Sequence, residues 1–345
     1  MREIFFNRAW SFLLGLGLMM GVLTGCSNSG QSEMPFHKIG VQADSGERES
    51  GLSIVCTTYP QYNWVQQILG ENWEKAEVTY LLKSGVDIHS YQPSAEDMIA
   101  VLDCDLLIGV GGESEQWLEK ALEGRRNQEQ KVIFMMEVLG DRVWEEEWID
   151  GMQKERGEGE KEEEDVVEYD EHVWLSLKNA ERICQEISDV LGELDLENRE
   201  FYQKNAAAYQ KQLQQLDQKY QELSDTAGRR VLLFADRFPF RYLVEDYGWE
   251  YYAAFAGCSA ETEASFETVA FLAEKVEEYD LPVVYRIETS DDSIAKTVIN
   301  STREKNQKIL VLDSLQAVTE KEIEEGISYL SVMEQNLEWL RQGLE

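Results

Sequence analysis

The chain has 345 residues, with 67 acidic side chains against 32 basic ones, and its formal net charge at pH 7 is −35. So large a negative charge argues against a nucleic-acid-binding protein, because such proteins need basic surface to displace counterions from phosphates. A hydrophobic fraction of 43% is enough for packed cores, and the length allows two domains of ordinary size.

The N-terminus is typical of an exported protein. Residues 1–25 hold two arginines and then an apolar run at 12–22, which is shorter than the about 20 residues of a membrane span. Two small residues directly before Cys26 form a pattern that resembles the lipobox of bacterial lipoproteins. This resemblance implies that Cys26 carries a lipid. Residues 26–50 are polar and predict a flexible tether, so we expect an extracytoplasmic protein anchored to the cell membrane.

Short apolar strands alternate with helices in residues 51–195, which favours a lobe built around a parallel sheet. Strands are predicted at 52–58, 77–82, 105–110 and 131–136, and helices at 61–70, 94–102, 117–122 and 175–191. An insertion at 145–171 has fourteen carboxylates, three basic side chains and no apolar period. We interpret it as a solvated, mobile loop; the alternative is a loop that weakly collects cations.

Residues 196–226 contain neither glycine nor proline and predict one helix, which at 1.5 Å per residue would be long enough, at roughly 40 Å, to cross two lobes. Residues 227–345 return to the alternating pattern. Strands are predicted there at 231–234, 249–255, 282–287 and 308–312, and helices at 241–246, 266–279 and 319–340. The predicted fold is therefore α/β, with two lobes that each hold a mostly parallel sheet flanked by helices, joined by one long backbone helix.

Only two histidines follow the tether, His89 and His172. His89 comes after a predicted strand, at the sheet edge where ligand sites of open α/β sheets gather. Such a histidine can equally be structural, and spacing alone does not join two residues so far apart in the chain. The four cysteines after the tether show no CxxC spacing and are interpreted as small buried thiols, not as a metal site. They are Cys56, Cys104, Cys184 and Cys258.

Two motifs resemble those of a known family. Residues 85–97 read GVDIHSYQPSAED, and residues 170–176 read DEHVWLS. They look like the two histidine motifs of the metal-binding lipoproteins of ABC importers for zinc and manganese, and the resemblance covers nearly the whole mature chain. It implies a monomeric solute-binding protein, not an enzyme, that captures Zn²⁺ or, as second choice, Mn²⁺ between its lobes. The metal would pass to a membrane permease that a separate ATPase drives.

Carried onto this chain, the resemblance places the metal ligands at His89, His172, Asp236 and Glu288. Ala235 stands where zinc-binding members have a third histidine, so the adjacent Asp236 is taken as the third ligand. The alternative is that Asp236 pairs with a neighbouring arginine, which leaves three protein ligands. Two imidazoles and two carboxylates are a set that a borderline divalent ion accepts.

Two other functions remain open from the sequence. A surface-anchored zinc metallohydrolase would use the same ligands with a metal-bound water, and Glu261 or Glu263 would serve as general base. A metal-independent adhesin or scaffold of the same fold is favoured only by the loss of the histidine at Ala235. The chain has no P-loop motif, so we do not expect it to power transport itself.

Overall fold

The structure is a computed structural model that describes residues 51–153, 168–259 and 263–345, all within one unit of the chain. The predicted signal, Cys26 and the tether therefore lie outside the described residues, as do 154–167 and Glu261. No helix in the described part of the chain combines the length and apolarity needed to cross a membrane.

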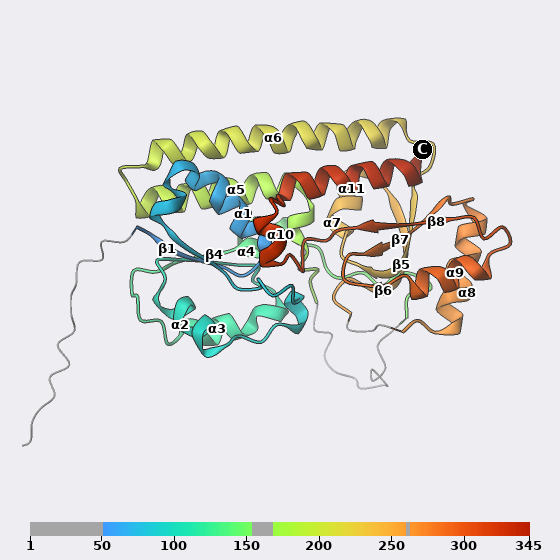
Figure 1. Cartoon of the computed structure of the whole chain (residues 1–345), viewed down its shortest axis with the longest axis horizontal. Helices are drawn as coiled ribbons and strands as arrows, with labels where there is room; N and C mark the ends of the chain where they lie inside the picture. Colours follow the sequence, from blue (N-terminus) through green and yellow to red (C-terminus); the bar gives the residue numbers. More distant parts are fainter. Residues whose placement is uncertain (1–50, 154–167, 260–262) are drawn as a thin grey trace, which may run out of the picture. The chain divides into compact units, whose positions relative to one another are not determined.

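The first lobe is built around a four-stranded parallel sheet with the order β2-β1-β3-β4. Its strands are β1 (Ser53–Cys56), β2 (Glu77–Tyr80), β3 (Leu106–Gly109) and β4 (Lys131–Phe134). The central strands are apolar on both sides because helices cover both faces of the sheet. These helices are α1 (Tyr59–Leu69), α2 (Ala95–Asp103), α3 (Gln116–Leu122), α4 (Met135–Leu139) and α5 (Leu177–Leu194). Helices α2 and α3 cover one face, and α1 and α5 the other (Figure 1).

The second lobe repeats this arrangement, with a parallel sheet of order β6-β5-β7-β8. Its strands are β5 (Val231–Phe238), β6 (Glu250–Ala256), β7 (Val283–Ile287) and β8 (Lys308–Leu312). Its helices are α7 (Arg241–Tyr247), α8 (Phe266–Glu278), α9 (Ser293–Ser301), α10 (Glu320–Glu324) and α11 (Tyr329–Leu344). The pairing of β5 with β6 shifts register between Phe234 and Arg237, so a bulge lies at Ala235 and Asp236.

The long helix α6 (Arg199–Thr226) contacts α1 and α5 of the first lobe and α7 and α11 of the second. Its buried side chains recur every three or four residues, which places them on one face of the helix. They include Tyr202, Ala206, Tyr209, Leu213, Leu216, Tyr220 and Leu223. These side chains belong to a hydrophobic cluster that reaches into both sheets. The predicted α/β fold with two lobes and one long backbone helix is confirmed.

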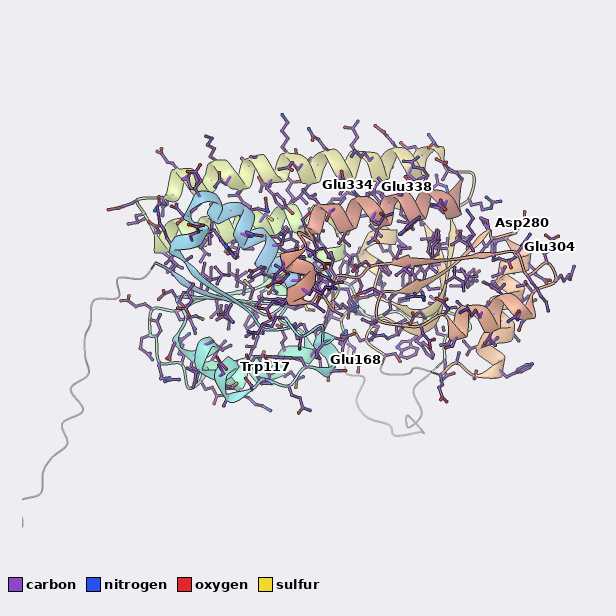
Figure 2. The ribbon with its side chains drawn as sticks, in the orientation of Figure 1. Trp117, Glu168, Asp280, Glu304, Glu334 and Glu338 are labelled. Atoms are coloured by element: carbon purple, nitrogen blue, oxygen red, sulfur yellow. The ribbon has the colours of Figure 1, made fainter. Side chains whose placement is uncertain are left out.

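Some predicted elements are wrong in detail. The single helix predicted at 319–340 is two helices, α10 and α11, because the chain turns at Gly326, whose φ is +91°. Ser328 then starts α11 with a capping box. Glu334 and Glu338 lie on the exposed side of α11 (Figure 2). The short helices α4 and α9 were not predicted.

The acidic insertion is not solvated throughout, which corrects the interpretation of 145–171. Its two ends pair with each other, since Glu146 N–H donates to the Glu168 carbonyl at 2.8 Å and Asp170 N–H to the Trp144 carbonyl at 2.9 Å. Asp170 and Glu171 are each only 2% exposed. The C-terminal end of the insertion is therefore part of the buried protein interior.

Candidate metal centre

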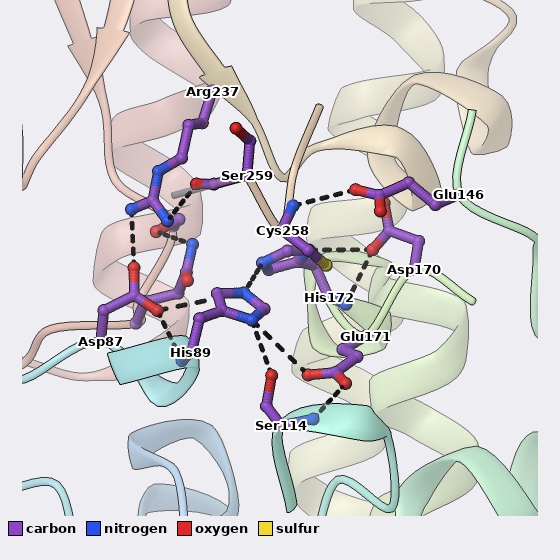
Figure 3. A network of polar contacts seen from close by, with 12 residues as sticks. Asp87, His89, Ser114, Glu146, Asp170, Glu171, His172, Arg237, Cys258 and Ser259 are labelled. Carbon is purple, nitrogen blue, oxygen red and sulfur yellow. Dashed lines mark hydrogen bonds and ion pairs between the residues drawn. The ribbon is translucent and has the colours of Figure 1, made fainter. Parts of the chain in front are cut away.

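His89 and His172 meet at one place in the structure. His89 lies in the 3-10 helix η2 (Ile88–Ser90), and His172 comes directly before η5 (Val173–Leu175), which leads into α5. Their Nε2 atoms are 3.2 Å apart (Figure 3). Two nitrogen ligands at about 2.0–2.1 Å from a tetrahedral Zn²⁺ would lie about 3.3 Å from each other. The two imidazoles are therefore spaced as two ligands of one ion.

A carboxylate contacts the His172 ring at Nδ1, the nitrogen that does not face His89. Asp170 Oδ1 lies 2.9 Å from His172 Nδ1 and also accepts the His172 backbone N–H at 2.8 Å. Asp170 therefore engages the Nδ1 side of the ring, and Nε2 faces His89, with whose Nε2 it forms a hydrogen bond of 3.2 Å. Burial alone would lower the pKa of His172, but the charge of Asp170 raises it above its ordinary value. This carboxylate–imidazole arrangement is typical of a histidine that binds a metal.

A hydroxyl holds the ring of His89. Ser114 Oγ, in η3 (Glu113–Glu115), lies 2.7 Å from His89 Nδ1, and the His89 backbone N–H donates to Asp87 Oδ1 at 3.0 Å. Burial, and then the charge of His172, lower the pKa of His89 to about 4. His89 is therefore neutral at pH 7, and a neutral imidazole is the form that binds a metal.

Negative groups surround the two imidazoles. Glu171 is 2% exposed and its Oε1 accepts the Ser114 backbone N–H at 2.8 Å. Its Oε2 makes no hydrogen bond within the described residues and lies 3.8 Å from His89 Nδ1. Asp87 is shared with the second lobe, because its Oδ2 pairs with Arg237 Nη2 at 2.6 Å. The buried carboxylate of Glu171 favours a cation near the two histidines, whereas the charge of Asp87 is already paired with Arg237.

Asp236 is held by hydrogen bonds within the second lobe. Its Oδ2 accepts the Ile287 backbone N–H at 3.0 Å, and its Oδ1 accepts from Ser290 Oγ at 3.0 Å and from the Arg237 backbone N–H at 2.8 Å. Among the described residues, it is not in the group of potential ligand atoms around His89. The role of Asp236 as a ligand stays a prediction. To bind the ion, its carboxylate would have to give up these hydrogen bonds.

Glu288 follows β7 and is likewise engaged elsewhere. Its two oxygens accept from the Ser314 backbone N–H at 2.8 Å and from Ser314 Oγ at 2.7 Å. Burial, and then the charge of Asp313, raise the pKa of Glu288 to about 8. In the described part of the chain it too lies outside the group of potential ligand atoms around the histidines. Glu288 as the fourth ligand also stays a prediction.

Cys258 lies beside the two histidines, which the sequence did not indicate, and it is only partly buried. It follows β6, and its Sγ and the ligand nitrogens of His89 and His172 all lie within 4.8 Å of one another. The other three described cysteines are buried thiols, as expected. A signal was available: the chain lacks an imidazole at Ala235 and has a cysteine after the neighbouring strand. The contact of Ser114 with His89 could not be predicted from the sequence, because single serines in loops are common.

A model of the family described as "ZnuA: Zinc-uptake complex component A periplasmic" matches residues 54–343. The chain belongs to this family. The resemblance that the two histidine motifs suggested is thereby confirmed.

Relatives of known name agree with this family. The zinc-binding lipoprotein AdcA of Streptococcus pneumoniae (strain ATCC BAA-255 / R6) is 31% identical over 297 residues, which are 86% of this chain and 56% of AdcA. The chain thus spans about half the length of that relative. The high-affinity zinc uptake system protein ZnuA of Bacillus subtilis (strain 168) is 28% identical over 346 residues, 98% of each chain. The crystal structure of the Zn(II)-bound ZnuA-like domain of S. pneumoniae AdcA has a TM-score of 0.66 at 29% identity, covering 86% of this chain and 99% of that one.

Proposed function

We propose that this chain is the extracytoplasmic receptor of a zinc ABC importer, anchored to the membrane through Cys26. It captures Zn²⁺ at His89 and His172 and delivers the ion to a permease that a separate ATPase energises. The observation that carries the proposal is the pair of Nε2 atoms 3.2 Å apart, each on a ring whose Nδ1 has a partner. The zinc-binding names of the relatives support it.

We infer that zinc is the preferred cargo and that manganese binds more weakly. For a given site of nitrogen and oxygen donors, divalent affinity rises from Mn²⁺ towards Zn²⁺. Imidazole ligands suit Zn²⁺, whereas Mn²⁺ prefers oxygen ligands. The family resemblance gives Asp236 and Glu288 as candidates for the remaining positions. Asp236 lies within β5, two residues before its end, and Glu288 directly follows β7.

A titration tests the proposal. The metal-stripped full-length protein is titrated with Zn²⁺ and with Mn²⁺ against a competing chelator, beside His89→Ala and His172→Ala. We expect one zinc per chain and a loss of at least about 100-fold in affinity in each variant, since each removes one of the two ligands on which the ion depends. Asp236→Ala and Glu288→Ala report whether the carboxylates take part.

The control for this titration is His37→Ala, which removes the third histidine of the chain and should leave affinity unchanged. Wild-type affinity in both His89→Ala and His172→Ala would show that the site is elsewhere. If the wild-type protein binds neither ion, the metal-independent scaffold takes the place of this proposal. Hydrolysis that depends on bound zinc would favour the metallohydrolase instead.

A further inference from the structure

We propose that the thiolate of Cys258 is the third protein ligand of the captured ion. The inference rests on the proposed function and deepens it, because it names the metals that the site selects. Asp236, the ligand expected from sequence, is held by other hydrogen bonds, and its neighbour Ala235 offers no donor atom. Cys258 brings a donor atom from the same lobe to the two imidazoles.

The distances suit one small ion. The Cys258 Sγ and the two imidazole nitrogens lie within 4.8 Å of one another (Figure 3). In a tetrahedral zinc site with Zn–S near 2.3 Å and Zn–N near 2.0–2.1 Å, sulfur and nitrogen ligands lie about 3.6 Å apart. Because no two of the three donor atoms are more than 4.8 Å apart, a shift of about 1 Å or less brings the sulfur to that spacing.

The backbone around Cys258 is held against His172. The Cys258 N–H donates to Glu146 Oε1 at 2.9 Å, and Glu146 is in turn paired with the far end of the acidic insertion. The preceding residue is Gly257, where a Cβ would lie only 3.2 Å from His172 Cε1 and 3.0 Å from the Phe238 carbonyl oxygen. The lack of a side chain at Gly257 therefore allows the backbone after β6 to pass directly beside the His172 ring. This places the sulfur of the next residue, Cys258, close to the same ring.

A second observation, independent of the cysteine, also points to a cation at this place. Glu171 Oε2 is buried, has no hydrogen bond within the described residues and lies 3.8 Å from His89 Nδ1. A buried carboxylate oxygen without a hydrogen bond is costly unless a positive charge compensates it. An ion held by the two imidazoles and the sulfur supplies that charge.

A thiolate ligand changes which metals the site prefers. Sulfur ligands favour Zn²⁺ and other borderline or soft ions, while Mn²⁺ favours carboxylate and water oxygens. The thiol releases its proton to solvent when the metal–sulfur bond forms, so binding frees one proton per ion from this residue. Because Cys258 belongs to the second lobe and both histidines to the first, the ion also links the two lobes.

Cobalt binding tests this inference directly. Co²⁺ is added to the metal-stripped full-length protein under reducing, oxygen-free conditions, and the near-ultraviolet spectrum is followed. We expect a thiolate-to-cobalt charge-transfer band in the wild-type protein and in Cys184→Ala, and no such band in Cys258→Ser. Zinc affinity in Cys258→Ser should fall by at least about tenfold, while manganese affinity changes by less than about threefold.

The outcomes separate this inference from the proposed function. Cobalt binding that needs His89 and His172 but gives no charge-transfer band overturns the role of Cys258 and leaves the receptor function standing. Absence of cobalt and zinc binding in the wild-type protein overturns both. A measurement without any variant covers the case in which Cys258→Ser does not fold. Zinc should slow alkylation of Cys258, read from its peptide by mass spectrometry, and equal rates with and without zinc would contradict the inference.

Discussion

At the residue scale, the groups behind the two imidazoles determine what their Nε2 atoms can bind. Asp170 lies 2.9 Å from His172 Nδ1, and Ser114 lies 2.7 Å from His89 Nδ1. Each partner engages the Nδ1 side of its ring, which leaves Nε2 for a ligand. Of the two, only Asp170 carries a charge, so it also increases the basicity of the imidazole that it holds.

Asp170→Asn should therefore weaken zinc binding by about 10-fold to 100-fold while the protein stays folded. The amide keeps an acceptor oxygen near Nδ1 but removes the negative charge that supports the bound ion. Competition against a zinc chelator measures the change, and Asp189→Asn, at an exposed position of α5, is the matched control. Unchanged affinity in Asp170→Asn would mean that the charge of Asp170 has no part in binding.

A second residue-scale prediction concerns Glu115, whose Oε2 accepts the backbone N–H groups of Val110 and Gly111. Burial raises the pKa of Glu115 to about 7, whereas an unfolded glutamate titrates near 4.3. The folded state thus holds this proton more tightly, so its contribution to stability is full below about pH 4 and is lost as the pH rises through about 7. Urea unfolding of both proteins at pH 5 and at pH 8 measures this loss. The free energy of unfolding should fall between these two pH values by on the order of 2 kcal/mol less in Glu115→Gln than in the wild-type protein. An equal fall in both proteins would contradict this assignment.

At the scale of elements, the acidic insertion has two parts with different roles. Its ends supply Glu146, which binds the Cys258 backbone, and Asp170 and Glu171, which surround the histidines. Its composition suggested a single solvated loop because carboxylates are usually exposed. These three carboxylates instead contact the groups of the candidate site, and two of them, Asp170 and Glu171, are buried there.

Replacing residues 154–167 by a short Gly-Ser linker should leave zinc affinity within about threefold of wild type, since among the described residues the groups around the histidines already include two imidazoles, a thiol and a buried carboxylate. The same titration reports the result. Glu146→Ala is the comparison: it removes the acceptor of the Cys258 N–H, and we expect it to weaken zinc binding more than the linker does. A large loss with the linker alone would mean that residues 154–167 supply ligands.

At the scale of the whole described body, the two lobes share one core. A single hydrophobic cluster includes residues of both sheets and of α6 and α11. Hydrogen bonds between the two lobes add to this shared hydrophobic cluster. Trp174 Nε1 donates to the Ser314 carbonyl at 2.9 Å, and the Tyr329 hydroxyl donates to the Trp174 carbonyl at 2.6 Å. The lobes therefore stabilise each other.

We predict that both lobes unfold in one transition. Thermal unfolding followed by far-ultraviolet circular dichroism and by tryptophan fluorescence should give coincident curves. Zinc at 100 times its dissociation constant should add about 2.7 kcal/mol of stability to the wild-type protein and far less to His89→Ala. Two separated transitions, or an equal effect of zinc on both proteins, would contradict this picture.

The sequence by itself determined the α/β class, the two lobes, the long helix at Arg199–Thr226 and the two histidine motifs, because apolar periodicity and local motifs are properties of neighbouring residues. It failed at the end of the chain, where a glycine turn divides one apolar pattern into α10 and α11. Local pattern reports which side chains are buried, but it does not report which of them meet.

Only the tertiary structure decided the composition of the cluster. It brought His89 to His172, placed Cys258 beside them, and engaged Asp236 and Glu288 in hydrogen bonds of their own. These contacts depend on the order of the strands and on the packing of loops at the carboxyl ends of two different sheets. The residues concerned lie far apart in the chain, so their convergence is a property of the fold and not of their spacing.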